Sequence, residues 1–251
     1  VHRVGRENGQ GDQLPTERTG QRAGMEGLGR ILRPRRYHEQ RAEEGMMRDV
    51  IVITKPEMFP GETEVVNTLF ANGMQRLHLR KPGASEQEMA EWIGRIDLPF
   101  RQRIIVHDHH RLLRTMGLGG IHLNARNPEA PAWFSAERQK RRSVTLSRSC
   151  HSLEEIAQWK GVCDYLFLSP IFDSISKGGY TSAFTRETLL QAYHDGLFSK
   201  PVYALGGVSA DNIRSIYDYG FAGAAVIGSL WQVHPFTTAT LVGRLKELQG
   251  T

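Results

Sequence analysis

The sequence predicts an α/β protein with a single (β/α)8 TIM barrel, and three observations carry this prediction. Short apolar runs recur from residue 50 onward, and segments of helical period separate them. The runs are nearly continuous in apolar residues, which is typical of parallel strands covered on both faces. The connections are short and leave room for eight strand–helix units. An open doubly wound sheet is the alternative, but the turn after the first strand lacks the G-x-G-x-x-G pattern.

The expected strands and helices alternate along the chain. The strands are expected at 50–53, 77–79, 103–106, 120–123, 143–146, 165–168, 201–205 and 224–227. The helices are expected at 62–72, 85–96, 110–116, near 132, from 152 onward, and at 186–193, 209–220 and 235–248. Ser85 and Ser152 each precede a glutamate by three residues, which is the spacing of a capping box. In such a barrel, the active site lies where the strands end.

The first 45 residues break this pattern. They contain nine arginines, seven acidic residues and no lysine, with scattered apolar side chains. Such a segment cannot bury enough apolar surface to offset the entropy of ordering it. Three interpretations stay open: a basic tail that contacts nucleic acid, a flexible or targeting extension, and misassigned sequence upstream of a start at Met46 or Met47. We favour a disordered or misassigned extension over residues 1–46 and a barrel over residues 47–251.

Composition excludes several classes of protein. The net charge of +5 includes the arginine-rich first segment, so it does not indicate nucleic-acid binding. Cys150 and Cys163 are too few for a disulfide framework. No apolar run reaches the roughly 18 residues of a membrane span, and no signal peptide is evident. We therefore expect a cytoplasmic protein whose partners are small molecules, with no nucleic acid and no membrane.

The stretch from Pro201 to Leu230 carries the clearest signal for a ligand. Its two apolar runs end in the pairs Gly206-Gly207 and Gly228-Ser229. Glycine lets backbone N–H groups approach an anion, and a following helix adds its positive end. The loops after strands seven and eight commonly form the phosphate site of this barrel. The stretch therefore predicts a phosphate site, with tight packing of the glycine turns as the alternative.

Cationic and hydroxyl side chains follow several other strands. Arginine suits bidentate binding of phosphate, lysine acts as a point charge, and serines in a glycine-rich loop can act from a lid. Each residue alone is equally consistent with a solvated loop, but their shared position at one end of the barrel favours a site. Those expected to bind phosphate or diphosphate are Arg80, Lys81, Ser149, Ser174, Ser176, Lys177, Gly206, Gly207, Gly228 and Ser229.

Histidines and one aspartate complete the strand-end side chains. Asp108 is a candidate Mg²⁺ ligand, because Mg²⁺ held with a diphosphate needs only one or two protein carboxylates. The run 107–110 could instead hold a transition metal, although neighbouring residues that leave a strand point in different directions. His151 precedes a helix N-terminus, which suits a neutral general base, with a hydrogen-bonded loop histidine as the alternative. Substrate contacts are expected from His78, His107 and His122.

A series of motifs runs from about Val50 to Leu248. They read LHLRKPG (77–83), IVHD (105–108), GIHL (120–123), SRSCHSLEE (147–155) and DYLFLSPIFDSISKGGY (164–180), followed by ALGGVSADNI and AAVIGS. In this order they resemble the thiamine phosphate synthase/TenI family of (β/α)8 barrels. The last two segments resemble the phosphate turns of that family.

The resemblance implies one of two activities. In the synthases, a Mg²⁺-bound pyrimidine diphosphate ionises to a carbocation, which the nitrogen of a thiazole phosphate captures. That branch implies diphosphate contacts from Arg80, Ser149 and Lys177, Mg²⁺ binding by Asp108, and phosphate contacts from Gly207, Ile227 and Gly228. In TenI-like tautomerases, a thiazole carboxylate phosphate is aromatised by proton transfer without a metal. That branch implies catalysis by His151. Lys177 is a further candidate catalytic residue, whichever branch applies.

Departures from the family pattern bear on this choice. The family motif Q-F-R-E-K reads HLRKP at 78–82, and the expected second metal aspartate is Asn127 or absent, which weakens Mg²⁺ binding. The run around His151 resembles the tautomerase branch. We therefore lean to a tautomerase, with a synthase as the alternative and a non-catalytic regulatory barrel as the alternative of another class.

The cofactor is Mg²⁺ for a synthase and none for a tautomerase, and the resemblance allows a homodimer.

Overall fold

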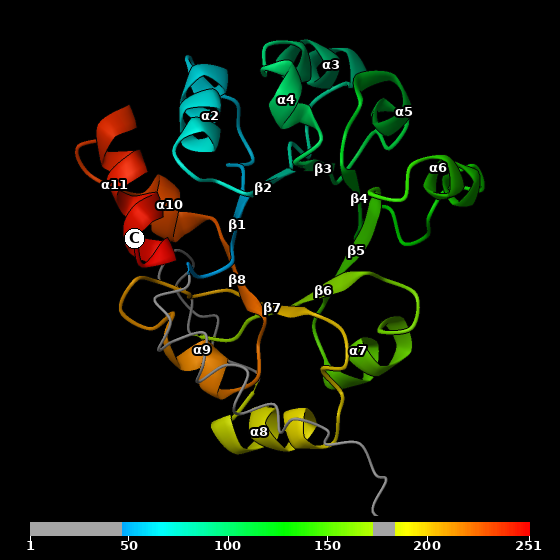
Figure 1. Cartoon of the computed structure of the whole chain (residues 1–251), viewed down its shortest axis with the longest axis vertical. Coiled ribbons are helices and arrows are strands. Elements are labelled where there is room, and N and C mark those ends of the chain that lie inside the picture. Colours follow the sequence, from blue (N-terminus) through cyan, green and yellow to red (C-terminus); the bar gives the residue numbers. More distant parts are fainter. Residues whose placement is uncertain (1–46, 173–183) are drawn as a thin grey trace, which may run out of the picture.

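Eight parallel strands form a closed barrel in the computed structural model, which describes residues 47–172 and 184–251. Each strand pairs with the next along the chain, and β8 pairs with β1 to close the ring (Figure 1). The strands are β1 (Val50–Ile53), β2 (Arg76–Leu79), β3 (Ile104–Val106), β4 (Gly120–Leu123), β5 (Thr145–Cys150), β6 (Tyr165–Leu168), β7 (Val202–Leu205) and β8 (Gly223–Val226). The predicted (β/α)8 barrel is confirmed.

The helices form a ring outside the strands (Figure 1). Within the described residues they are α2 (Glu62–Ala71), α3 (Glu86–Gly94), α4 (Leu98–Arg101), α5 (Leu112–Met116), α6 (Phe134–Lys140), α7 (Leu153–Trp159), α8 (Arg186–His194), α9 (Ser215–Asp218), α10 (Gly228–Trp231) and α11 (Thr238–Gln249). The short helices α4 and α10 are not expected from the sequence. None of the described helices combines the length and the apolar character needed to cross a membrane.

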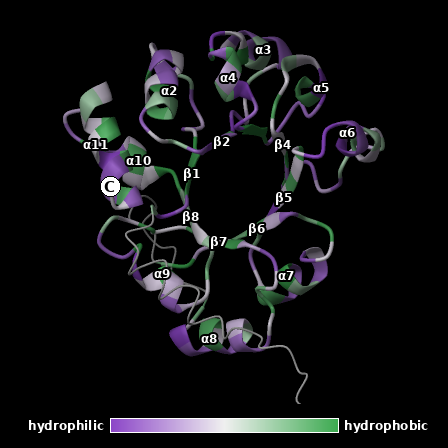
Figure 2. Ribbon diagram, viewed as in Figure 1, coloured by the Kyte–Doolittle hydropathy of each residue, from purple (hydrophilic) through white to green (hydrophobic). Residues whose placement is uncertain are grey.

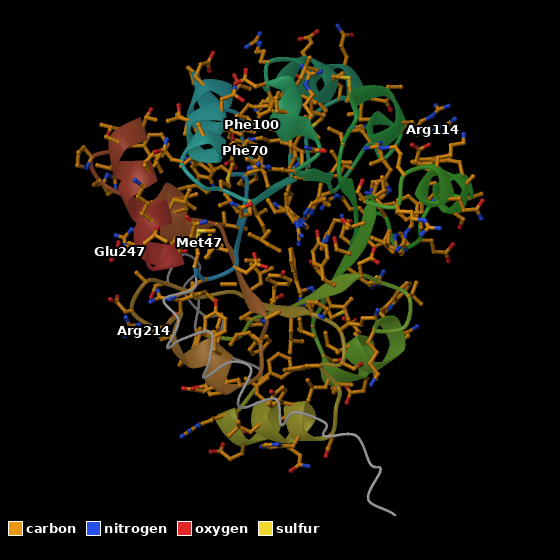
Figure 3. The ribbon with its side chains drawn as sticks, viewed as in Figure 1. Met47, Phe70, Phe100, Arg114, Arg214 and Glu247 are labelled. Atoms are coloured by element: carbon orange, nitrogen blue, oxygen red, sulfur yellow. The ribbon has the colours of Figure 1, made fainter. Side chains whose placement is uncertain are left out.

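Two apolar clusters fill the molecule. The larger one lies between the strands and the helices, and Figure 2 shows hydrophobic residues along strands such as β1 and β7. Phe70 of α2 stacks on Phe100 of α4 in this outer layer, with ring centroids 5.1 Å apart (Figure 3). The smaller cluster lines the barrel interior with Ile51, Ile53, Tyr165, Phe167, Tyr203 and Ala225. Burial on both faces accounts for the continuous apolar runs in the sequence.

The two expected capping boxes differ in the structure. Ser85 accepts a hydrogen bond from the backbone N–H of Glu88, and the Glu88 carboxylate accepts from the Ser85 N–H in return. Ser152 likewise accepts from the N–H of Glu155. The Glu155 carboxylate, however, accepts from the N–H of His151 at 2.7 Å. The Glu155 carboxylate therefore holds the backbone of His151, the residue before the N-cap Ser152, instead of closing a capping box on Ser152.

The segment expected as a helix over 209–220 is mostly a series of turns, and α9 begins only at Ser215. The Asn212 side chain explains the difference. Its oxygen accepts from the Ser209 N–H at 2.8 Å, and its amide nitrogen donates to the Gly207 carbonyl at 2.9 Å. Side-chain bonds of this kind compete with helical hydrogen bonds and favour turns.

Candidate active site

The structure brings His78, His107 and His122 together inside the C-terminal end of the barrel. They come from β2, the end of β3 and β4, which are neighbouring strands whose inward side chains face one another. The ring centroids of His107 and His122 lie 4.1 Å apart, and each lies 5.1 Å from that of His78. All three side chains are buried. We call these three residues the histidine cluster.

Hydrogen bonds join the histidine cluster to the strands around it. His78 Nδ1 lies 2.9 Å from His107 Nε2, and His78 Nε2 lies 2.8 Å from the Tyr165 hydroxyl. The two ring nitrogens of His122 each lie 2.8 Å from a hydroxyl of β5, one from Ser147 and one from Ser149. The expected strand over 143–146 extends to Cys150 in the structure, and this extension places both serines beside His122.

Burial keeps the histidine cluster neutral. It lowers the pKa of His122 to about 3, and the pKa values of His78 and His107 also lie well below that of a free imidazole. Positive charge on neighbouring arginines adds to the effect, and a proton on one imidazole would oppose a proton on the next. The cluster therefore adds no positive charge, and within the described residues His107 Nδ1 is its ring nitrogen without a partner.

Three buried imidazoles are also a candidate donor set for a transition metal, since one ring nitrogen from each lies within 4.8 Å of the others. Both ring nitrogens of His78 and of His122 already have hydrogen-bond partners. The rings of His107 and His122 are stacked, with 24° between their planes, so they do not converge on one point. This geometry fits a hydrogen-bonded polar cluster better than a metal centre.

Arg80 lies at the mouth of the barrel, just after β2. Its backbone is held by Thr54, whose hydroxyl accepts from the Arg80 N–H at 2.9 Å and donates to the Arg80 carbonyl at 3.1 Å. The side chain is half-buried, and within residues 47–172 and 184–251 its guanidinium has no hydrogen-bond partner. Burial and the positive charge of Arg126 lower its pKa, while Asp108 raises it. The guanidinium is therefore available to an anion.

Lys81 differs from its predicted role in phosphate binding. Its side chain is 1% exposed, and Nζ donates to the Glu62 carboxylate at 2.6 and 2.8 Å. It also donates to the carbonyls of Lys55 and Glu57, each at 2.9 Å. An ammonium has three protons, and these acceptors use all of them. Lys81 thus holds the loop after β1 rather than an anion at the mouth.

Asp108 faces donors rather than open space. Its carboxylate accepts from Arg126 Nε at 3.1 Å and Nη2 at 2.9 Å, and from the Asn127 amide at 2.9 Å. Mg²⁺ requires a near-octahedral shell of oxygen ligands at about 2.1 Å. A carboxylate whose two oxygens are already bound by a guanidinium and an amide does not fit that requirement. The geometry disagrees with the predicted Mg²⁺ role of Asp108.

His151 stands on another side of the mouth, after β5. Its Nδ1 lies 3.1 Å from the Ser169 carbonyl and 3.2 Å from the Ser169 hydroxyl. Because a carbonyl can only accept, Nδ1 carries the proton and Nε2 is the free, basic nitrogen. The side chain is exposed. This arrangement suits proton transfer at Nε2.

The glycine turn after β7 leaves two backbone donors open. Gly206 and Gly207 have φ angles of 91° and 66°, in the region that favours glycine. A Cβ at Gly206 would lie 3.0 Å from Pro170, so a larger residue would be strained in φ and would have to displace Pro170. Within the described residues, the N–H groups of both glycines have no acceptor. Ser229, beyond β8, has a buried hydroxyl that likewise has no partner among these residues.

Some of the predicted site residues lie outside the described part of the chain, and the structure adds other residues to the site. Ser174, Ser176 and Lys177 lie outside the described residues. Ile227 and Gly228 lie where β8 meets α10. His109 and His110 do not join His107 in one cluster, since His109 Nε2 bonds the Ala84 carbonyl at 2.7 Å. Sequence reasoning missed Arg126, Ser147 and Tyr165, although the strand alternation that places Tyr165 inward is visible in the sequence.

Comparison with known proteins gives one consistent family. A family model described as thiamine monophosphate synthase matches residues 50–230. The thiamine-phosphate synthase of Geobacillus kaustophilus is 26% identical over 59% of this chain and 65% of its own length. That of Halalkalibacterium halodurans is 26% identical over 73% of this chain and 89% of its own length. This chain thus spans just under two thirds of the first relative and most of the second.

Solved structures agree with this result. The thiamine phosphate pyrophosphorylase from Bacteroides thetaiotaomicron has a TM-score of 0.68 and is 35% identical, over 80% of this chain and 95% of its own. A thiamine phosphate pyrophosphorylase from Pyrococcus furiosus has a TM-score of 0.61 at 22% identity, over 80% of this chain and 96% of its own, which supports the fold alone. The match over residues 50–230 shows that the chain belongs to the thiamine phosphate synthase/TenI family.

Proposed function

We propose that this protein is an enzyme of thiamine biosynthesis that joins a pyrimidine diphosphate to a thiazole phosphate and releases diphosphate. The observation that carries this proposal is a pair of separate anion-binding features at one barrel mouth. One is the guanidinium of Arg80 after β2, and the other is the pair of N–H groups at Gly206 and Gly207 after β7; neither has a hydrogen-bond partner within residues 47–172 and 184–251. A reaction of two phosphorylated substrates needs both, whereas a reaction of one needs only one.

In the proposed reaction, the bond between the pyrimidine methylene carbon and the diphosphate oxygen breaks, and the electron pair stays on the oxygen. The carbocation left behind accepts the lone pair of the thiazole nitrogen, which gives thiamine phosphate. Arg80 stabilises the charge that develops on the leaving diphosphate. The glycine N–H groups hold the thiazole phosphate at the other side of the mouth.

The histidine cluster is placed to line the space between these anions. Its residues lie one or two positions before Arg80 and Asp108 and at the end of β4. The lowered pKa values keep the three imidazoles uncharged, so they do not repel a carbocation. Within the described residues His107 Nδ1 has no hydrogen-bond partner, so this nitrogen can hydrogen-bond a ring nitrogen or the amino group of a pyrimidine.

The test is an assay of the full chain with pyrimidine diphosphate, thiazole phosphate and Mg²⁺ in the buffer, with thiamine phosphate detected as thiochrome. Wild type should form product. Arg80→Ala should raise the KM for the pyrimidine diphosphate about tenfold, because a hydrogen bond to a charged group contributes about 1.5–3 kcal/mol. The KM for the thiazole phosphate should change little.

Arg114→Ala is the matched control, because Arg114 is an exposed arginine of α5 on the outer ring (Figure 3). It should behave as wild type. No product from wild type would contradict the proposal, and so would an equal effect of the two variants.

The tautomerase remains a second candidate, and the hydrogen bond that fixes the protonated Nδ1 of His151 favours it. In that reaction Nε2 takes a proton from the thiazole carboxylate phosphate and returns it at another atom of the ring. His151→Ala should then abolish conversion of the non-aromatic tautomer while thiazole phosphate still binds. If the synthase proposal holds, the same variant should retain formation of thiamine phosphate to within about tenfold.

A further inference from the structure

A second guanidinium, on the loop after β4, is near enough to Arg80 for its charge to lower the pKa of Arg80. Arg126 binds both oxygens of Asp108 through Nε and Nη2, at 3.1 and 2.9 Å. This is the bidentate arrangement in which arginine and a carboxylate pair most strongly. Two of the five N–H bonds of the guanidinium are used in this way, and within the described part of the chain the others have no acceptor.

The loop holds Arg126 in this position. The side-chain oxygen of Asn124 accepts from the backbone N–H groups of Arg126 and Asn127, at 2.9 and 3.1 Å. The amides of Asn124 and Asn127 in turn donate to the His107 carbonyl, at 3.1 and 3.0 Å. The loop is thereby tied to the strand end that carries Asp108. The backbone of the loop that carries Arg126 is therefore ordered before a ligand binds.

Charges of both signs act on Arg80. The positive charge of Arg126 lowers the pKa of Arg80, whereas the negative charges of Asp108 and Glu57 raise it. The Arg126 side chain is 44% exposed, so an incoming anion can reach it. Two planar guanidinium groups, each able to bind a pair of oxygens, favour a ligand with several phosphate oxygens.

We propose that Arg126 stands in for a metal ion at Asp108, and that Arg80 and Arg126 together bind the diphosphate group without Mg²⁺. This inference rests on the proposed synthase function. When the carbon–oxygen bond breaks, the electron pair remains on the diphosphate oxygen, and the two guanidinium groups stabilise the added negative charge. No proton is transferred in this step. Asp108 acts as the anchor that aims Arg126 rather than as a metal ligand.

The first test compares turnover of the full chain in EDTA with turnover in Mg²⁺. Wild type should form thiamine phosphate at rates within about twofold in the two buffers. A loss of product in EDTA that Mg²⁺ restores would overturn the inference. Arg126→Ala should lose about tenfold or more in EDTA, as expected when a charged hydrogen-bonding group is removed. It should regain part of this loss in Mg²⁺, because Asp108 is then free to bind the ion.

Two further variants sharpen this test. Arg114→Ala should match wild type in both buffers. Asp108→Asn preserves the shape of the side chain but removes the charge and one of the two oxygens that aim Arg126. It should therefore lose activity in EDTA, by no more than Arg126→Ala does, and Mg²⁺ should not restore it. Metal-dependent turnover in wild type, or an Arg126→Ala variant indistinguishable from wild type in EDTA, would contradict the role of Arg126.

Binding of inorganic pyrophosphate separates this inference from the synthase proposal. Isothermal titration of wild type should give dissociation constants within about threefold in EDTA and in Mg²⁺. The affinity of Arg126→Ala in EDTA should be weaker by about tenfold. This result would support the arginine site even if no thiamine phosphate were formed. Binding seen only with Mg²⁺ would overturn it even if the enzyme were an active synthase.

Discussion

Several buried polar side chains have specific partners. Lys81 and Glu62 form a buried ion pair, and Trp92 adds a hydrogen bond to the same carboxylate. The histidine cluster is satisfied instead by hydroxyl groups and by its own members. Burial without a partner costs each polar group several kcal/mol, on the order of 2–7. These partners decide which side chains remain available to a substrate.

His122 provides a prediction at this scale. Its pKa is about 3 in the native protein, whereas a free imidazole titrates near 6.5. Between these values the unfolded chain binds the extra proton, so the free energy of unfolding falls as the pH falls. One such histidine contributes about 1.4 kcal/mol per pH unit.

The measurement is urea unfolding of wild type and His122→Gln at several values between about pH 6 and pH 4. Glutamine keeps an amide beside Ser147 and Ser149 but does not titrate. The slope for the variant should be shallower by about 1.4 kcal/mol per pH unit. Parallel curves for the two proteins would show that burial does not suppress protonation of His122.

At the scale of the elements, the sequence predicts most strands well because each is an apolar run buried on both faces. The sequence does not predict the end of β5, because Ser147, Arg148 and Ser149 are polar. Their strand conformation depends on partners across the sheet. His122 accepts or donates to both serines, and Arg148 donates to the Pro128 carbonyl at 2.8 Å. Such contacts between distant residues leave no periodicity in the sequence.

The same limit applies to the site. Strand ends and glycine turns place Arg80, Gly206 and the histidine cluster at one end of the barrel, as predicted. The sequence could not show that Lys81 turns toward Glu62, because the two are 19 residues apart. Nor could it show that Arg126 pairs with Asp108 across the mouth, 18 residues away. The choice between a metal ion and a guanidinium at Asp108 depends on this one contact.

For the whole molecule, closure of the ring gathers side chains from eight strands around one mouth. The cationic residues Arg80 and Arg126 follow β2 and β4, and the open glycine donors follow β7. The neutral histidine cluster comes from β2 to β4. The central claim is that this mouth holds two anions at once, a diphosphate by arginine side chains and a phosphate by backbone donors.

The most direct test is to titrate thiazole phosphate into the full chain that is already saturated with inorganic pyrophosphate. If the two anions occupy separate sites, thiazole phosphate should still bind one molecule per chain. Its affinity should stay within about fivefold of that for the protein alone, since the two ligands share no contact apart from charge repulsion. Direct competition, in which pyrophosphate displaces thiazole phosphate, would show a single anion site and contradict the claim.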